Sequence, residues 1–210
     1  TEFKNPATSH NNDNPVSYQI VSGQDVATVS EDGKLTLLKA GTVTVRASIA
    51  ANETYKGAFA EYTITIDIAE DEGFIFANPN PAAITYGDNG NVFTNPAQGG
   101  HGTGAVVYEV ISATLADGTP VSDPTTVAEV DESGTLTIKK AGEVTVSARR
   151  ESDGKYDGIS TQYTLKINKA QQEPLLFESA NPDDIMIKEG SFQNPIEGGS
   201  GSGKLTYQIV

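Results

Sequence analysis

The sequence predicts an all-β protein made of tandem β-sandwich repeats of about 100 residues each. The first observation is an internal repeat, in which Gly33–Ala47 returns as Gly134–Ala148, displaced by 101 residues and identical at ten of fifteen positions. The second is the alternation of apolar and polar residues inside both copies. The third is a composition with 21 glycines and no long helix-forming run. A repeat of this period indicates tandem domains.

The repeated stretch predicts a β-hairpin with one buried and one solvated face. Leu35 and Leu37 precede a Lys-Ala-Gly turn, and Val43 and Val45 follow it, each pair separated by a threonine. Period-two alternation on both sides of a glycine turn is typical of a hairpin. A slip of one residue would turn every side chain to the wrong face, so agreement between the copies supports this register. The inward positions of the second copy are Leu136, Ile138, Val144, Val146 and Ala148.

The repeat divides the chain into three units, called the first, middle and third units below. The first unit, residues 1–68, is expected to be a repeat that lacks its opening strand. The middle unit, residues 73–169, is expected to be complete, and the third unit, residues 174–210, to hold the opening strands of a truncated repeat. The opening segment Phe74–Tyr86 of the middle unit recurs as Leu175–Ile187 in the third unit and has no counterpart in the first.

The middle unit carries an insertion of about eleven residues between Tyr108 and Val127. Its sequence around Leu115–Pro120 is rich in Asp, Gly and Pro, which predicts a longer surface hairpin. Loops on a repeated scaffold are common binding surfaces. Residues 111–124 are therefore a candidate ligand loop, with Leu115, Asp117 and Thr119 as candidate contacts.

The charge balance and the absence of cysteine exclude several functions. Twenty-eight acidic residues against fourteen basic ones give a net charge of −14, whereas a nucleic-acid surface needs a basic patch. No apolar run approaches the roughly 18 residues of a membrane span. The absence of cysteine removes disulfides, thiolate catalysis and cysteine-based zinc sites together.

The sequence offers no catalytic constellation. The two histidines, His10 and His101, fall in the same inter-strand loop of their units, one position out of register. Neither can be combined with a nucleophile and a carboxylate, or with a convergent ligand set, from the sequence. We therefore predict a protein that is not an enzyme, with no catalytic or cofactor-binding residue.

Two glycine-rich segments, Gly99–Gly104 and Gly198–Gly203, superficially resemble phosphate-binding loops. Such loops present backbone N–H groups at the start of a helix. The residues that follow Gly104 predict a strand instead. Flexible inter-strand loops are therefore expected at both places.

The linker between the first and middle units is the best metal candidate. Asp67, Glu70, Asp71 and Glu72 bring four carboxylates into six residues, and calcium at a domain junction needs six to eight oxygen ligands. The equivalent second linker, Asn168–Pro174, has lost most of this charge. The sequence favours a solvated acidic linker and leaves calcium as the alternative.

The repeated motifs resemble bacterial immunoglobulin-like repeats of the group 2 kind. The resemblance lies in Val-Ala-x-Val, then Gly-x-Leu-Thr, then Lys-Ala-Gly-x-Val-Thr-Val and a closing Tyr-x-Leu/Ile-x-Ile, within residues 26–66 and 127–167. The Phe-x-x-x-Asn-Pro openings and the glycine loops are similar to those of giant repeat-array adhesins. The resemblance implies immunoglobulin-like sandwiches in a secreted or surface-exposed bacterial protein, where such repeats act as spacers or as ligand-binding tips.

The expected function is that of a structural extender, which projects a binding tip from the cell. Its expected partners are neighbouring repeats of the same or an identical chain, with a host, glycan or surface ligand as a further class. Two alternatives stay open. The incomplete first and third units are complementary, so chains could complete one another by strand donation and form a filament. The 111–124 insertion could instead make the middle unit a ligand-binding module.

Overall fold

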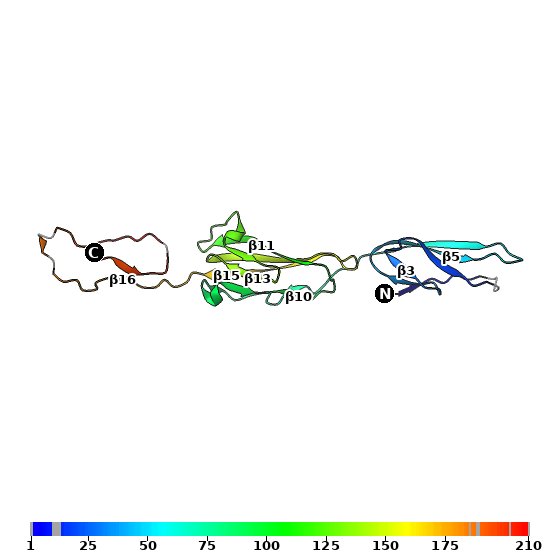
Figure 1. Cartoon of the computed structure of the whole chain (residues 1–210), viewed down its shortest axis with the longest axis horizontal. Helices are drawn as coiled ribbons and strands as arrows, with labels where there is room; N and C mark the ends of the chain where they lie inside the picture. Colours follow the sequence, from blue (N-terminus) through cyan, green and yellow to red (C-terminus); the bar gives the residue numbers. More distant parts are fainter. Residues whose placement is uncertain (1, 10–13, 185, 188–189, 202, 210) are drawn as a thin grey trace.

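The computed structural model describes residues 2–9, 14–184, 186–187, 190–201 and 203–209. Figure 1 shows the three units in a row along one axis, with the N-terminus in the first unit, on the side that faces the middle unit, and the C-terminus in the third unit. The described residues form strands and two short 3-10 helices, which confirms the all-β prediction. None of the helices in these residues has the length and apolar character that crossing a membrane requires.

The middle unit is a two-sheet sandwich. One sheet has the order β11-β14-β15-β8, the other has the order β12-β13-β9, and β7 pairs with β10. The elements are β7 (Ile75–Phe76), β8 (Ile84–Thr85), η1 (Asp88–Gly90), β9 (Val92–Thr94), β10 (Ala97–Gln98), β11 (Val106–Leu115), η2 (Pro124–Thr126), β12 (Ala128–Val130), β13 (Thr135–Ile138), β14 (Gly142–Arg150) and β15 (Ile159–Asn168).

The first unit repeats most of this topology. Its sheets have the orders β2-β5-β6 and β1-β4-β3, which match β11-β14-β15 and β9-β13-β12 of the middle unit. Even a register shift in the ladder recurs, after Ile20 in one unit and after Val110 in the other. Among the described residues, no strand of the first unit stands in the positions of β7 and β8. The strands are β1 (Glu2–Lys4), β2 (Ser17–Ser22), β3 (Ala27–Val29), β4 (Lys34–Leu37), β5 (Gly41–Ile49) and β6 (Ala58–Ile66).

The predicted inward register is confirmed. Leu35, Val43 and Val45 are fully buried in the first unit, and their counterparts Leu136 and Val144 are fully buried in the middle unit. A strand that covers a core on one face must place alternate residues inside, so the period-two pattern fixes which face is apolar.

The predicted hairpin is wrong, because its two strands belong to different sheets. β4 pairs with β1 and β3, whereas β5 pairs with β2 and β6. The turn before β5 therefore crosses from one sheet to the facing one. At Gly41, where φ is 147°, a Cβ would lie 2.8 Å from Cγ2 of Val26. Two strands show the same alternation of apolar and polar residues whether they pair within one sheet or face each other across the core. The sequence pattern therefore could not distinguish a hairpin from this crossing.

The insertion forms the predicted surface hairpin. The Leu115 amide donates to the Thr119 carbonyl at 2.8 Å, and Thr114 and Pro120 form an isolated bridge. The chain then returns along β11, where the Val121 amide donates to the Ala113 carbonyl at 3.1 Å. The inserted residues therefore extend the edge of the sandwich.

The third unit contains one strand pair, β16 (Leu175–Phe177) with β17 (Ile196–Gly198), in antiparallel register. This pairing repeats that of β7 with β10. None of the described residues after Ala170 is buried. This pair lies on no core among the described residues, unlike β7 and β10 of the middle unit.

Candidate functional site

The junction between the first and middle units holds a network of polar contacts between the linker and the edge of the middle unit. The linker that follows β6 joins the edge of the middle unit through Ala69, which forms a parallel bridge with Tyr156. The Ala69 amide donates to the Lys155 carbonyl at 2.9 Å, and the Asp157 amide donates to the Ala69 carbonyl at 2.8 Å. The linker backbone is thus fixed before it enters β7.

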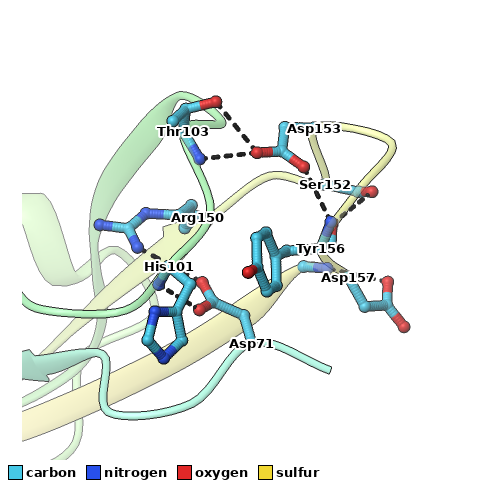
Figure 2. A network of polar contacts seen from close by, with 9 residues as sticks. Asp71, His101, Thr103, Arg150, Ser152, Asp153, Tyr156 and Asp157 are labelled. Carbon is cyan, nitrogen blue, oxygen red and sulfur yellow. Dashed lines mark hydrogen bonds and ion pairs between the residues drawn. The ribbon is translucent and has the colours of Figure 1, made fainter. Parts of the chain in front are cut away.

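Asp71 is the centre of this site (Figure 2). Its side chain is completely buried, and its carboxylate accepts the backbone N–H of His101 at 2.6 Å and Nη1 of Arg150 at 3.3 Å. Hydrogen bonds from the His101 and Gly102 amides and from Arg150 hold the pKa of Asp71 below its usual value, against the opposing effect of burial. The carboxylate is therefore charged at neutral pH and is satisfied by fixed donors.

Arg150 connects this carboxylate to the hydrophobic core. The residue ends β14, and its guanidinium lies 4.5 Å from the ring centroid of Phe74, which opens the middle unit. A guanidinium over an aromatic face is attracted by the ring quadrupole while its nitrogen atoms stay free to donate. Arg150 therefore contacts both Asp71 and the first core residue after the linker.

The glycine-rich segment Gly99–Gly104 is packed, whereas the sequence predicted a flexible loop. A Cβ at Gly99 would lie 2.2 Å from the Gly73 carbonyl oxygen, and a Cβ at Gly104 would lie 1.8 Å from the Glu151 carbonyl oxygen. Gly99 and Gly100 also have φ values of +77° and +75°, which side chains disfavour. These glycines let the backbone approach Asp71 and the end of β14 closely.

Asp153 holds the other end of this loop. Its carboxylate accepts the Thr103 amide at 2.8 Å, the Thr103 hydroxyl at 2.9 Å and the Tyr156 amide at 2.8 Å. The amide hydrogen bond from Thr103, followed by those from Tyr156 and Lys155, lowers the pKa of Asp153. The rings of His101 and Tyr156 stack beside it, with centroids 5.6 Å apart. We call Asp71, His101, Thr103, Arg150 and Asp153 the junction network.

The first unit contacts the same region directly. The Ala40 amide, in the turn that crosses between its sheets, donates to the Gly154 carbonyl at 2.7 Å. A shallow groove beside this contact is lined by Leu38, Ile66, Asp67 and Tyr156. The two units therefore touch at the turn as well as through the linker.

The junction between the middle and third units repeats this arrangement with an uncharged linker side chain. Gln172 occupies the linker position of Asp71, and a Cβ at Gly199 of the third unit would lie 3.2 Å from its Nε2 atom. The Glu173 amide donates to the Ser200 hydroxyl at 3.1 Å, and Ser200 is the counterpart of His101. In both junctions the glycine loop therefore contacts the side chain at this linker position.

The remaining predicted site residues do not converge. Asp67, Glu70 and Glu72 are exposed, and the described part of the chain holds no group of three or more His, Asp or Glu residues that could bind a metal. Calcium at the linker stays a prediction. In the ligand loop, the Asp117 carboxylate accepts the Thr119 amide at 2.9 Å, so it stabilises its own turn. His10 lies outside the described residues.

No family model and no curated protein sequence matches the chain. Solved structures give loose likenesses. Domains EC1-2 of human protocadherin-24 share 16% identity over 81% of this chain and 88% of that one, with a TM-score of 0.37. Domains EC1-4 of Drosophila N-cadherin share 14% identity over 76% and 42%, with a TM-score of 0.35. A SusE-like surface-located polysaccharide-binding protein of Bacteroides thetaiotaomicron shares 17% identity over 72% and 29%, with a TM-score of 0.29. At these TM-scores the fold assignment rests on the strand order of the chain itself.

Sequence reasoning missed Arg150 and the role of the glycine loop. It placed Asp71 in a solvated linker, although the structure buries its side chain. The signal was present in the equal placement of glycines at Gly99–Gly104 and Gly198–Gly203, because a flexible loop has no reason to repeat the same glycine spacing.

Proposed function

We propose that this chain is a non-enzymatic extender of a secreted or surface-exposed bacterial protein, in which successive β-sandwiches hold a binding region away from the cell. The observation that supports this function is the complete burial of the Asp71 side chain at the junction of the first and middle units. A linker that served only as a flexible tether would leave its carboxylates in water, where they pay no desolvation penalty.

Three contacts along the junction oppose bending. Ala69 is hydrogen bonded on both sides to the middle unit, Asp71 is held by the glycine loop, and Ala40 reaches Gly154 from the first unit. Because these contacts lie at different points along the linker, bending at any one of them breaks hydrogen bonds. Such a junction suits a rod that must keep its reach.

The surface charge agrees with the same role. A net charge of −14 makes neighbouring copies repel one another, which keeps a crowded surface array soluble.

The experiment is a comparison of inter-unit motion by small-angle X-ray scattering and by a distance distribution between labels in the first and middle units. We expect a narrow distribution in the wild-type chain and a broader one with a shorter mean distance in Asp71→Ala. Glu70→Ala is the matched control, because Glu70 is exposed in the same linker. Equally broad distributions in all three proteins would contradict the extender proposal.

A second candidate function is ligand binding through residues 111–124. A groove runs between this insertion and the end of β15, lined by Leu115, Gly118, Glu143 and Lys169 among others. Replacing Ala116–Thr119 by a short glycine turn tests this function on the surface-displayed protein. Unchanged adhesion after the replacement would contradict ligand binding through this loop and would leave the extender role as the proposed function.

A further inference from the structure

The outer face of the sheet β2-β5-β6 in the first unit carries an aromatic residue among polar ones. Val45 of β5 is fully buried, so the next residue, Arg46, points away from the core, and so does Ser48. The strand register places two rows of side chains across this face, Gln19-Arg46-Glu61 and Ser17-Ser48-Phe59. We call these six residues the Phe59 face.

Three side chains of the Phe59 face hold one another in place. The Phe59 residue is 66% exposed, and the guanidinium of Arg46 lies over its ring, 4.7 Å from the ring centroid. Nε and Nη2 of Arg46 each lie 2.6 Å from Oε1 of Glu61. The ring, the guanidinium and the carboxylate are therefore fixed on two paired strands and remain open to water, which lowers the entropy lost on binding a ligand.

The middle unit lacks this set of side chains at the same places in its sheet. The counterparts of Phe59, Arg46 and Glu61 are Ser160, Ser147 and Gln162, in the same pairing register. The adjoining row is unchanged, with a threonine pair in both units whose hydroxyl oxygens lie 3.0 and 3.3 Å apart. The sandwich thus forms without the aromatic residue and the ion pair, so stability of the fold does not account for them.

This face stays open when units stand in a row. Ser160 and Gln162 are exposed in the middle unit, although the first unit, the linker and β7 are all in place before it. Exposure is therefore a property of this face of the sandwich, whatever precedes or follows a unit. A ligand can reach Phe59 within an array.

We propose that the Phe59 face binds an uncharged polysaccharide. The face of an aromatic ring is electronegative and attracts the C–H groups of a sugar ring that lies on it. Glu61 engages Arg46 through Oε1, which leaves Nη1 of Arg46 as a donor and Oε2 of Glu61 as an acceptor for sugar hydroxyls. The proposal goes beyond the extender role, because it gives the first unit a ligand of its own, away from residues 111–124.

The charge of the site favours an uncharged ligand. The chain carries a net charge of −14, whereas Arg46 and Glu61 neutralise each other on this face. A polyanion would be repelled by the chain as a whole and would meet the carboxylate of Glu61. A basic partner would be drawn to carboxylates that have no cation beside them. A ligand of hydroxyl and C–H groups matches both the ion pair and the ring.

The shape of the site favours a polymer. Sites for single small molecules are concave and bury most of the ligand. The Phe59 face is the outer surface of a sheet, on which rows of serine and threonine side chains lie beside the ring. Such a surface gives each sugar few contacts, and several linked sugars add their contacts.

The test is affinity electrophoresis of the whole chain in native gels that contain hydroxyethyl cellulose, galactomannan or dextran. Polygalacturonate is the charged comparison. The variant is Phe59→Ala, which removes an exposed ring and keeps the fold. Ser160→Ala is the matched control, because Ser160 holds the same place in the middle unit. A triple variant, with Ser147→Arg, Ser160→Phe and Gln162→Glu, builds the same set of side chains into the middle unit.

We expect at least one neutral polymer to retard the wild-type chain, and polygalacturonate to leave it unretarded. Phe59→Ala should raise the Kd for that polymer at least about tenfold. Ser160→Ala should leave it unchanged, and the triple variant should lower it through a second site.

Two results would overturn the proposal directly: no retardation by any neutral polymer, or equal retardation of the wild type and Phe59→Ala. Retardation by polygalacturonate alone would overturn the assignment of an uncharged ligand. A molar mass that rises with concentration in the wild type but not in Phe59→Ala, with no retardation by glycans, would also overturn it. That result would assign the face to a contact with a second copy of the chain.

Discussion

The carboxylate of Asp71 and the guanidinium of Arg150 meet at 3.3 Å, although 79 residues separate them. The side chain of Asp71 is completely buried and that of Arg150 is 12% exposed. Burying two charges is favourable only when each also has hydrogen-bond partners, and here the glycine loop donates to the acid while Phe74 covers the cation. The entry of the chain into the middle unit therefore depends on this pair.

The first prediction concerns Asp71→Asn. The amide keeps one acceptor oxygen but loses the charge and presents an N–H₂ group to the loop amides. We expect the His101 and Gly102 amides to exchange their hydrogen at least roughly tenfold faster, because the loop opens more often. Hydrogen exchange followed by mass spectrometry or NMR measures this change. Glu70→Gln in the same linker is the control, and an equal effect in both variants would contradict the role of Asp71.

The second prediction concerns pH. The folded pKa values of Asp71 and Asp153 are lowered from 3.8 by hydrogen bonds to the charged carboxylate. For a group with a depressed folded pKa, the stabilisation is present above the unfolded pKa and is lost as pH falls toward the folded value. We expect the Tm of the middle unit to fall below about pH 4, and to fall less steeply in an Asp71→Asn, Asp153→Asn double variant. A thermal melt series from pH 7 to pH 2 measures this, and identical slopes would contradict it.

The sequence was sufficient to predict which face of each strand is buried, but not which strands pair with each other. Leu35 and Val43 were placed inside correctly, because alternation follows from a one-sided core. Their strands were paired wrongly, since two strands of facing sheets bury the same pattern as two paired strands. Strands that follow each other in the sequence can pair in one sheet or lie in facing sheets, and only their contacts with other strands show which arrangement is present.

The junction network could not be predicted because its partners are far apart in the sequence. Asp71 lies 30 residues from His101 and 79 from Arg150, so no local pattern links them. Its burial reverses the expectation of a solvated linker. The repeated glycines and the Phe-x-Asn-Pro motif were visible in the sequence, and the structure gives each a contact: the loop approaches Asp71, and Asn95 holds the backbone of Asn78.

The third prediction uses the repeat as its own control. Gly104→Ala places a Cβ 1.8 Å from the Glu151 carbonyl oxygen, so the loop or β14 must move. We expect a loss of about 3 kcal/mol in the free energy of unfolding of the middle unit. Gly203, the equivalent residue of the third unit, has open space around the same position. Gly203→Ala should leave the urea midpoint unchanged, and equal midpoints for both variants would contradict the packed loop.

The fourth prediction concerns calcium. The oxygens of Asp71 face amide and guanidinium donors, while Asp67, Glu70 and Glu72 lie in solvent. A calcium site needs six to eight converging oxygens. We therefore expect the Tm in millimolar calcium and in EDTA to agree within about 1 °C. A rise with calcium concentration that disappears in Glu70→Gln, Glu72→Gln would instead establish a site at the linker.

The fifth prediction compares two equivalent phenylalanines. Phe76→Ala removes a fully buried ring in edge-on contact with Tyr163, and we expect a loss of about 4 kcal/mol. Phe177 is its counterpart in the third unit and is 53% exposed. Because half of its ring is already in solvent, Phe177→Ala should change the unfolding free energy by less than about 0.5 kcal/mol. Urea denaturation of both variants measures the difference. Equal losses in the two variants would contradict the difference in burial between the two rings.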